Sequence, residues 1–243
     1  MIENLSELKD TPAEVLPARK SRLLSLGFAR LRDLILSNFQ LLVHIGALVP
    51  LAVLLWDAST DNLTVNPIQA ATLRTGKIAL VLLVLTLACS PINMLTGFRP
   101  ALKARRALGL YTFMYAAIHF YIFVGLDYVF DPELLKEAIF EKRFALVGFG
   151  AFMILLALAV TSFKWWQKKL GRNWKRLHRL VYLAGLLVII HYVWLVKSDI
   201  RVPLAYGALV GVLLIMRIPR LKKAVVRLRQ RLQNFIRTRA LTS

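Results

Sequence analysis

The sequence predicts an all-α, polytopic membrane protein: a six-helix transmembrane bundle followed by a basic amphipathic C-terminal helix. Three observations predict this fold class. Of the 243 residues, 58% are hydrophobic, and the mean hydropathy is +0.59. The apolar residues gather in long runs that are nearly free of charge, as membrane-spanning helices require. The basic residues lie between these runs rather than within them.

Six apolar runs have about the length that crosses a bilayer. Pro50 and Pro91 lie inside the first two, where they are expected to kink the helix or to end its regular part early. The last run begins at Pro203 and is short for a span. The runs cover residues 39–56, 78–95, 107–126, 144–163, 179–197 and 202–218.

We divide the chain into an N-terminal segment (1–38), the six-span domain (39–218) and a basic tail (219–243). The N-terminal segment lacks the short apolar core and the cleavage site of a secretory signal. The tail is expected to be an amphipathic helix attracted to anionic lipid headgroups, with a docking site for a soluble partner as the alternative. Its apolar stripe consists of Leu221, Val225, Leu228, Leu232 and Phe235.

The positions of the charges predict the orientation of the spans. If both termini are cytoplasmic, the cytoplasmic segments carry 26 Lys and Arg residues and the segments on the other side carry 7. Lys and Arg favour the cytoplasmic side of a membrane, so the termini are predicted to be cytoplasmic. The net charge of +20 is therefore explained by the membrane, and nucleic acid is not an expected partner.

All four histidines fall in the predicted spans or at their edges: His44, His119, His178 and His191. An ionisable side chain inside a membrane is a candidate functional residue; the alternative is a neutral histidine hydrogen-bonded between helices. The only cysteine, Cys89, lies inside an apolar run, so disulfides and cysteine-based zinc sites are excluded. The sequence has no Cys-x-x-Cys-His, so a haem would not be attached covalently.

Depth along the helices predicts one histidine pair. The third and fifth spans run in the same direction, and each starts at a basic cluster on the same side of the membrane. His119 follows Arg106 by 13 residues and His191 follows His178 by 13, which is roughly 20 Å of helix. His119 and His191 should thus lie at similar depth in the outer half of the bilayer, as the two axial ligands of a six-coordinate haem b require.

The partner of His178 is left open. The position at its depth on the third span is Arg106, which does not ligate iron. The alternatives are a second haem between His44 and His178, a haem held by His178 alone, or no inner haem. Arg106 and Arg176 are candidates for binding haem propionates or the phosphate of a flavin nucleotide, or are ordinary basic residues of the cytoplasmic side.

Several stretches resemble one known family, the haem-binding membrane subunits of the bacterial periplasmic methionine-sulfoxide reductase system, within the ferric-reductase-like transmembrane group. The resemblance covers about residues 40–218. Its most specific parts are residues 66–76, 105–126, 170–183 and 191–197. The N-terminus is longer than is usual in the family, and the basic tail is also a departure from it.

The resemblance implies an electron-transfer subunit with haem b and FMN. It implies His119, His178 and His191 as haem ligands and matches His44 without giving it a role. The electron donor would be the quinone pool or a cytoplasmic flavin reductase. The acceptor would be a periplasmic molybdopterin-dependent reductase, the catalytic subunit that repairs oxidised methionines. No residue is assigned to FMN.

The sequence shows no Gly-rich nucleotide-binding turn after a strand and no soluble reductase domain, so we expect electrons to come from a separate donor. A self-contained ferric or quinone oxidoreductase is the nearest alternative, but it would need a substrate site of its own. A transporter with a histidine proton relay is less favoured, because no Asp or Glu lies in the middle of a span.

Overall fold

The computed structural model describes residues 38–196 and 199–242, with side chains up to residue 231. The chain divides into two compact units, Met1–Leu42 and Val43–Ser243. Among the described residues, only the start of the helix Asn38–Ser59 belongs to the first unit. The predicted N-terminal segment therefore lies outside the described residues, and the fold below is that of the second unit. Every regular element in the described part is helical, which confirms the all-α fold class.

Five helices are long and apolar enough to cross a membrane. A sixth, α9 (Arg201–Ile215), meets the same criterion only together with Pro219–Arg231, to which it is bent by 79°. The sixth predicted span is therefore the shortest, as its sequence indicates. The five are Asn38–Ser59, α2 (Pro67–Thr96), α3 with its π-helical end η1 (Arg99–Tyr121 and Ile122–Asp127), α5 (Arg143–Val160), and Arg172–Leu195, which contains α7 (Arg172–Leu177) and α8 (Leu180–Leu195).

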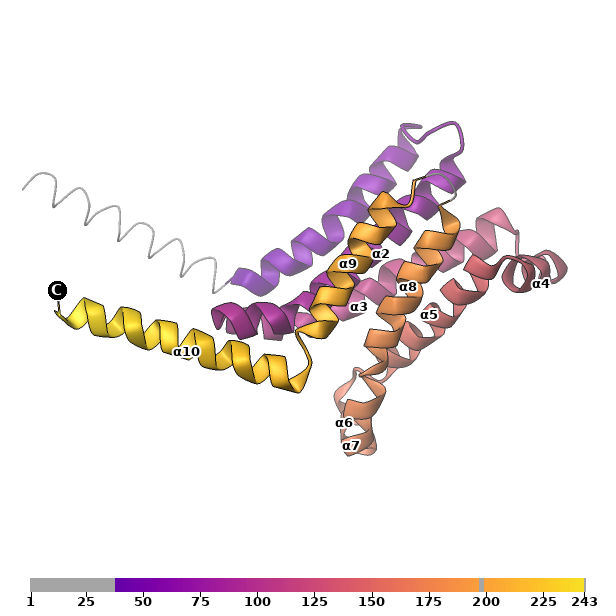
Figure 1. Cartoon of the computed structure of the whole chain (residues 1–243). Helices are drawn as coiled ribbons and strands as arrows, with labels where there is room; N and C mark the ends of the chain where they lie inside the picture. Colours follow the sequence, from indigo (N-terminus) through magenta and orange to yellow (C-terminus); the bar gives the residue numbers. More distant parts are fainter. Residues whose placement is uncertain (1–37, 197–198, 243) are drawn as a thin grey trace, which may run out of the picture. The chain divides into compact units, whose positions relative to one another are not determined.

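The remaining helices are short connections or the tail (Figure 1). They are α4 (Pro132–Glu141), which leads into α5, α6 (Lys164–Leu170), which follows it, and α10 (Pro219–Thr242). The predicted basic tail is thus helical, although the side chains of Leu232 and Phe235 lie outside the described residues.

Two helix pairs position the site: α2 packs along α3, and α5 packs along α8. One buried cluster joins α2 to α9 through Leu87 and Val210, and a second joins α2, α5 and α8 through Leu83, Leu155 and Ala184. α2 contributes to both clusters, so it is the element on which the two pairs meet.

α2 begins before its charged residues, Arg74 and Lys77, rather than after them. Asn66 caps it, its side chain accepting the amide hydrogen of Gln69, and Pro67 occupies the first turn, where its missing N–H costs nothing. The helix therefore starts eleven residues before the apolar run that predicts it, because hydropathy does not detect a cap. Gly97, in the left-handed conformation at φ 79°, ends it.

Neither internal proline ends its helix. The helix Asn38–Ser59 passes through Pro50, and α2 continues through Pro91 to Thr96. Proline lacks the amide hydrogen that would bond the carbonyl four residues earlier, which in α2 is that of Leu87. The guanidinium of Arg217 donates to this carbonyl at 2.6 Å, so the freed acceptor is satisfied from the turn between α9 and α10.

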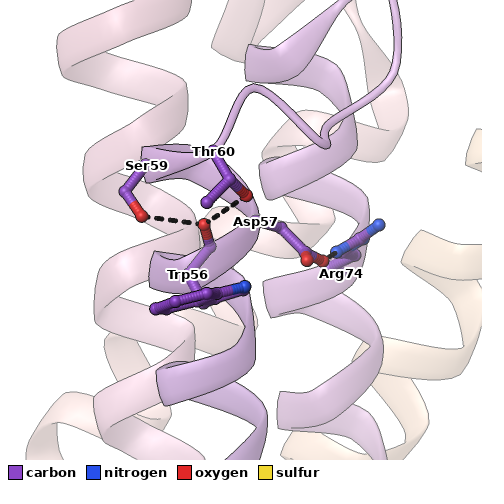
Figure 2. A network of polar contacts seen from close by, with 5 residues as sticks. All are labelled: Trp56, Asp57, Ser59, Thr60 and Arg74. Carbon is purple, nitrogen blue, oxygen red and sulfur yellow. Dashed lines mark hydrogen bonds and ion pairs between the residues drawn. The ribbon is translucent and has the colours of Figure 1, made fainter.

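Polar contacts close one end of the first two spans (Figure 2). The hydroxyls of Ser59 and Thr60 donate to the carbonyl of Trp56 at 2.8 and 2.9 Å, which satisfies the end of the helix Asn38–Ser59. Asp57 and Arg74, which point toward each other in Figure 2, form an ion pair between this helix and α2. The pair lies near the helix ends, away from the middle of either span.

The outward faces of the spanning helices are apolar. Leu41, Ile45, Val49 and Val53 repeat along one face of Asn38–Ser59 and are each about half exposed. Such a face would be a liability in water but is the expected surface against lipid tails. The exposure pattern and the helix lengths together show a multi-pass membrane protein.

Candidate functional site

The structure brings His119 of α3 and His191 of α8 together. Their ring centroids are 6.3 Å apart and the rings are nearly perpendicular, at 86°. Two imidazoles on opposite sides of one metal ion have centroids roughly 6 Å apart, because each metal–nitrogen bond is about 2 Å long. The separation therefore suits a shared metal ion. The proximity agrees with the depth argument from the sequence, while the role of the pair as ligands stays a prediction.

Two hydrogen bonds of the same kind fix the tautomers of the two rings. Nδ1 of His119 lies 2.9 Å from the carbonyl oxygen of Thr72 in α2. Nδ1 of His191 lies 2.7 Å from the carbonyl oxygen of Phe144 in α5. A carbonyl oxygen only accepts, so each Nδ1 must carry the hydrogen and each Nε2 keeps its lone pair. No hydrogen bond occupies either Nε2 in the part of the chain that the structure describes.

The two rings line a cavity of about 650 Å³, a volume typical of cofactor sites. Its walls come from α2, α3, α5 and α8 and are mainly apolar. Phe120 stacks on Phe152 with centroids 4.6 Å apart and lies 5.9 Å from Phe149, so flat aromatic surfaces line it beside the imidazoles. A flat, apolar group with a central metal fits these walls.

The set of ligands limits what kind of metal site this is. Among the described residues, no group of three His, Cys, Asp or Glu side chains could hold a metal ion. Two imidazoles alone do not complete the coordination of a bare ion. They do complete that of an iron whose other four ligands come from a planar macrocycle, so the residues fit a haem.

Lys77 and Lys142 supply the basic groups of the cavity wall, together with the acidic Asp127. Nζ of Lys142 donates to the hydroxyl of Tyr128 at 2.8 Å, and this bond raises the pKa of Lys142. Both lysines are exposed, and their side chains are basic. They are suited to pairing with carboxylates of a bound group.

Arg106 and Arg176 lie elsewhere. Both are exposed, and neither lines the cavity. The structure therefore does not bring these predicted cofactor-binding arginines to the His119–His191 pair. Their proposed pairing with propionates or a flavin phosphate stays a prediction for a separate inner site.

His178 has a different environment from the pair. Its Nε2 lies 3.2 Å from the hydroxyl of Thr161, and its ring lies 4.1 Å from that of Trp174, centroid to centroid. The hydroxyl of Thr161 donates its hydrogen to the carbonyl of Ala157 at 2.6 Å, so it accepts from Nε2 of His178. Trp174 also bonds the carbonyl of Thr161, at 2.8 Å, and this holds the ring against α5.

His44 has no hydrogen bond or ring contact with His119, His178 or His191 among the described residues. Its Nδ1 lies 2.9 Å from the hydroxyl of Tyr111, with the two rings edge to face, and its side chain is exposed. No hydrogen bond or ring contact joins His44 to His178 within the described residues, and neither lines the cavity. The pairing of His44 with His178 therefore stays one of the alternatives for an inner haem.

Sequence reasoning did not identify the residues that hold the pair. These are the carbonyls of Thr72 and Phe144 and, one helical turn further on, Gly76 and Gly148. A signal was present: the two hydrogen bonds span the same separation of 47 residues, so the chain repeats one Thr/Phe–Gly–His spacing. A search for repeated residue types could find the Gly–His part of this spacing but not the Thr/Phe part, because the accepting groups belong to the backbone.

Fold and site define a class: polytopic helical membrane proteins with a pair of histidines in an apolar cavity between their spans. The family model described as ferric reductase like transmembrane component matches residues 73–189, a range that contains His119 and His178. No solved structure is significantly similar to the chain.

Curated relatives give the particular family. The chain is 42% identical over 183 residues to the protein-methionine-sulfoxide reductase heme-binding subunit MsrQ of Xanthomonas axonopodis pv. citri (strain 306), covering 73% of this chain and 84% of the relative. It is 39% identical over 179 residues to the protein of the same name from Bordetella pertussis (strain Tohama I / ATCC BAA-589 / NCTC 13251), covering 73% and 87%. The chain belongs to the MsrQ family.

Proposed function

We propose that the chain is a b-type haem-binding subunit that carries electrons across the bacterial inner membrane to a methionine-sulfoxide reductase. The observation that carries this is the His119–His191 pair, with both Nε2 atoms unprotonated, in an apolar cavity lined by aromatic rings. The names of the MsrQ relatives, as heme-binding subunits, support it.

The cofactor would bind between His119 and His191, and Lys77 and Lys142 would pair with its propionates. If His119 and His191 both held the iron of a haem, no coordination position would be free for a substrate, and the group would supply one-electron transfer. The residues of the chain orient the ligands, exclude water from the apolar walls and place two positive charges beside the cofactor. Among the described residues, no group of three His, Cys, Asp or Glu side chains adds a separate metal site to the cavity.

The charge distribution supports the direction of transfer. With cytoplasmic termini, the loops before α2 and before α5 face the periplasm. The cavity is lined by the first half of α2 (from Ile68 to Leu83), the last turns of α3 and α8, and the start of α5. It would thus lie in the outer half of the membrane, where a periplasmic molybdenum-dependent reductase could accept electrons.

Several parts of the proposal rest on the family resemblance alone. They are the electron donor, either the quinone pool or a cytoplasmic flavin reductase, and a bound FMN, to which no residue is assigned. A second haem at His178, nearer the cytoplasmic side, would bring the donor side closer to the pair. His178 would be one ligand of this second haem, and no residue is assigned as the other.

The visible spectrum of the purified protein tests the proposal. A protein with bis-imidazole haem b shows a Soret band and sharp low-spin bands upon reduction, and its haem can be extracted because it is not covalently attached. The haem-to-protein ratio then distinguishes one site from two. A correctly folded, monodisperse preparation that stays colourless after haem reconstitution would rule the proposal out.

A further inference from the structure

The two cavity histidines are held in the same way by two different helix pairs. In α2 and α3, Nδ1 of His119 bonds the carbonyl of Thr72, and Gly76 follows Thr72 by one turn. In α5 and α8, Nδ1 of His191 bonds the carbonyl of Phe144, and Gly148 follows Phe144 by one turn. In both helix pairs the imidazole ring thus bonds a helix carbonyl and lies against the glycine one turn after that carbonyl.

Helix geometry explains why a glycine stands there. A backbone carbonyl inside a helix already accepts from the amide four residues on, so a side-chain donor must reach its second lone pair from outside. Side chains in a helix lean toward its N-terminus, so the Cβ of a residue covers the turn before it. The Cβ four residues after the accepting carbonyl therefore blocks the approach, and only glycine leaves it open.

The distances support this explanation at both glycines. A Cβ on Gly148 would lie 2.6 Å from Nδ1, 2.8 Å from Cε1 and 3.3 Å from Cγ of His191. At contacts under 3.0 Å the ring must shift, and because Nδ1 is the atom that bonds the carbonyl of Phe144, the shift would break or weaken that hydrogen bond. A Cβ on Gly76 would lie 3.1 Å from Nδ1 and Cε1 of His119, a milder conflict.

Three other glycines of the spans have open space where a Cβ would be added. Gly150 lies two residues after Gly148 on the same helix, and a Cβ added there would have nothing within 4 Å. The same holds for Gly46 and Gly211. A Cβ on Gly125 or Gly207 would also be close to a neighbour, 3.0 Å from Phe130 and 3.1 Å from Ile189, but among the described glycines only Gly76 and Gly148 lie against a histidine. Gly150 offers a matched control, because it has the same residue type on the same helix.

We propose that Gly76 and Gly148 are positioning residues for the cofactor: each lets a histidine sit on a helix carbonyl, which fixes the Nδ1–H tautomer and leaves Nε2 for iron. This inference rests on the proposed function. Because the conflict is more severe at Gly148, the His191 side of the site is the more sensitive to an added methyl group. Loss of an outer hydrogen bond to a metal-ligating histidine typically weakens metal binding by about 10–100-fold.

The test compares Gly148→Ala, Gly76→Ala and Gly150→Ala with the unaltered full chain, purified in detergent. Each apoprotein is titrated with haem, and the low-spin spectrum and the midpoint potential of the loaded protein are recorded. We expect Gly150→Ala to match the unaltered chain. Gly76→Ala should keep low-spin haem with a shifted potential, and Gly148→Ala should bind haem about 10–100-fold more weakly, with a high-spin component.

Added imidazole gives a second readout, since it can replace a displaced histidine on the iron. We expect it to restore the low-spin spectrum of Gly148→Ala without changing its fold, as monitored by helical content and gel filtration. If Gly148→Ala fails to fold, the potential and haem affinity of Gly76→Ala decide the question.

Three outcomes would overturn the inference. Gly148→Ala or Gly76→Ala could bind haem with unchanged affinity, spin state and potential. Gly148→Ala and Gly150→Ala could be impaired equally, which would indicate helix packing in general. An unaltered chain that binds no haem would overturn the proposed function along with it, and this result differs from the first two because it appears without any substitution.

Discussion

The four histidines of this chain differ in which ring nitrogen forms a hydrogen bond and in which group is its partner. His119 and His191 give Nδ1 to a backbone carbonyl and keep Nε2 for the cavity. His178 gives Nε2 to the hydroxyl of Thr161, and His44 bonds Tyr111. Chemical identity alone does not distinguish these residues; the partner of each nitrogen does.

Substitution of single histidines should separate these roles. His119→Ala and His191→Ala each remove one of the two imidazoles that face each other, so each should abolish the low-spin spectrum of the cavity haem. His44→Ala, at an exposed position outside the cavity, is the control and should keep it. Reduced-minus-oxidised spectra at equal protein concentration measure the effect. Full low-spin haem in both cavity variants would contradict the pairing.

His178 allows a separate prediction about stoichiometry. If a second haem binds there, His178→Ala should lose that haem alone and keep the cavity haem, because His178 does not line the cavity. The haem-to-protein ratio would then fall by about half while the spectrum of the remaining haem stayed low-spin. An unchanged ratio would mean that His178 is not an essential ligand, and loss of all haem would mean that the two sites are not independent.

At the scale of elements, α2 depends on a side chain from outside the helix. The carbonyl of Leu87, left without a donor by Pro91, accepts from Arg217, whose guanidinium also lies 4.8 Å from the ring centre of Tyr182 and donates to its hydroxyl at 2.7 Å. The contact joins the turn after α9 to the C-terminal third of α2. It lets a helix with an internal proline continue to its glycine cap at Gly97.

Arg217→Met should therefore destabilise the protein by about 1–3 kcal/mol, the typical cost of a buried polar group without a partner. In a Pro91→Ala background the loss should be smaller, because alanine supplies the amide hydrogen that the Leu87 carbonyl lacks. Thermal unfolding of the four proteins in detergent measures this coupling, with the exposed Arg220→Met as control. Equal losses in both backgrounds would show that Arg217 acts elsewhere.

The ion pair of Asp57 and Arg74 joins the helix Asn38–Ser59 to α2 in the same manner. The side chains are 21% and 41% exposed, so water screens part of the attraction. We expect a coupling of about 1 kcal/mol from a double-mutant cycle with Asp57→Asn and Arg74→Gln, decreasing with added salt. A coupling that is zero at low salt would show that the pair does not contribute to stability.

At the scale of the whole molecule, orientation decides which partner the cavity can reach. The proposal of cytoplasmic termini predicts that the loop after Asn38–Ser59 and the short α4 are exposed to the periplasm, and that α6 is not. Asn62→Cys and Glu137→Cys should then react with a membrane-impermeant maleimide in intact cells, whereas Lys168→Cys should react only after permeabilisation. The native Cys89 is 3% exposed and should give little background. The opposite labelling pattern would reverse the orientation and separate the cavity from a periplasmic acceptor.

The membrane class, the approximate spans and the shared depth of His119 and His191 could all be predicted from the sequence. Each of these depends on distance along one helix, either the length of an apolar run or the rise per residue from a basic cluster. Element ends were less predictable: α2 starts at Pro67 because of a cap and not because of hydropathy. Prolines were also misleading guides to helix ends, since a side chain from elsewhere in the fold can supply the missing donor.

Helix packing, in contrast, decides which ring nitrogen of each histidine is free and which neighbouring residues determine this. Gly148 and Gly150 look alike in the sequence, yet one lies against His191 and the other against open space. Likewise, the sequence places His44 and His178 at a compatible depth, but His44 bonds Tyr111 of α3, whereas His178 bonds Thr161 at the end of α5. Depth is a property of one helix, whereas ring direction and the need for a glycine depend on which carbonyl of a second helix lies opposite, and that is fixed only when the helices pack.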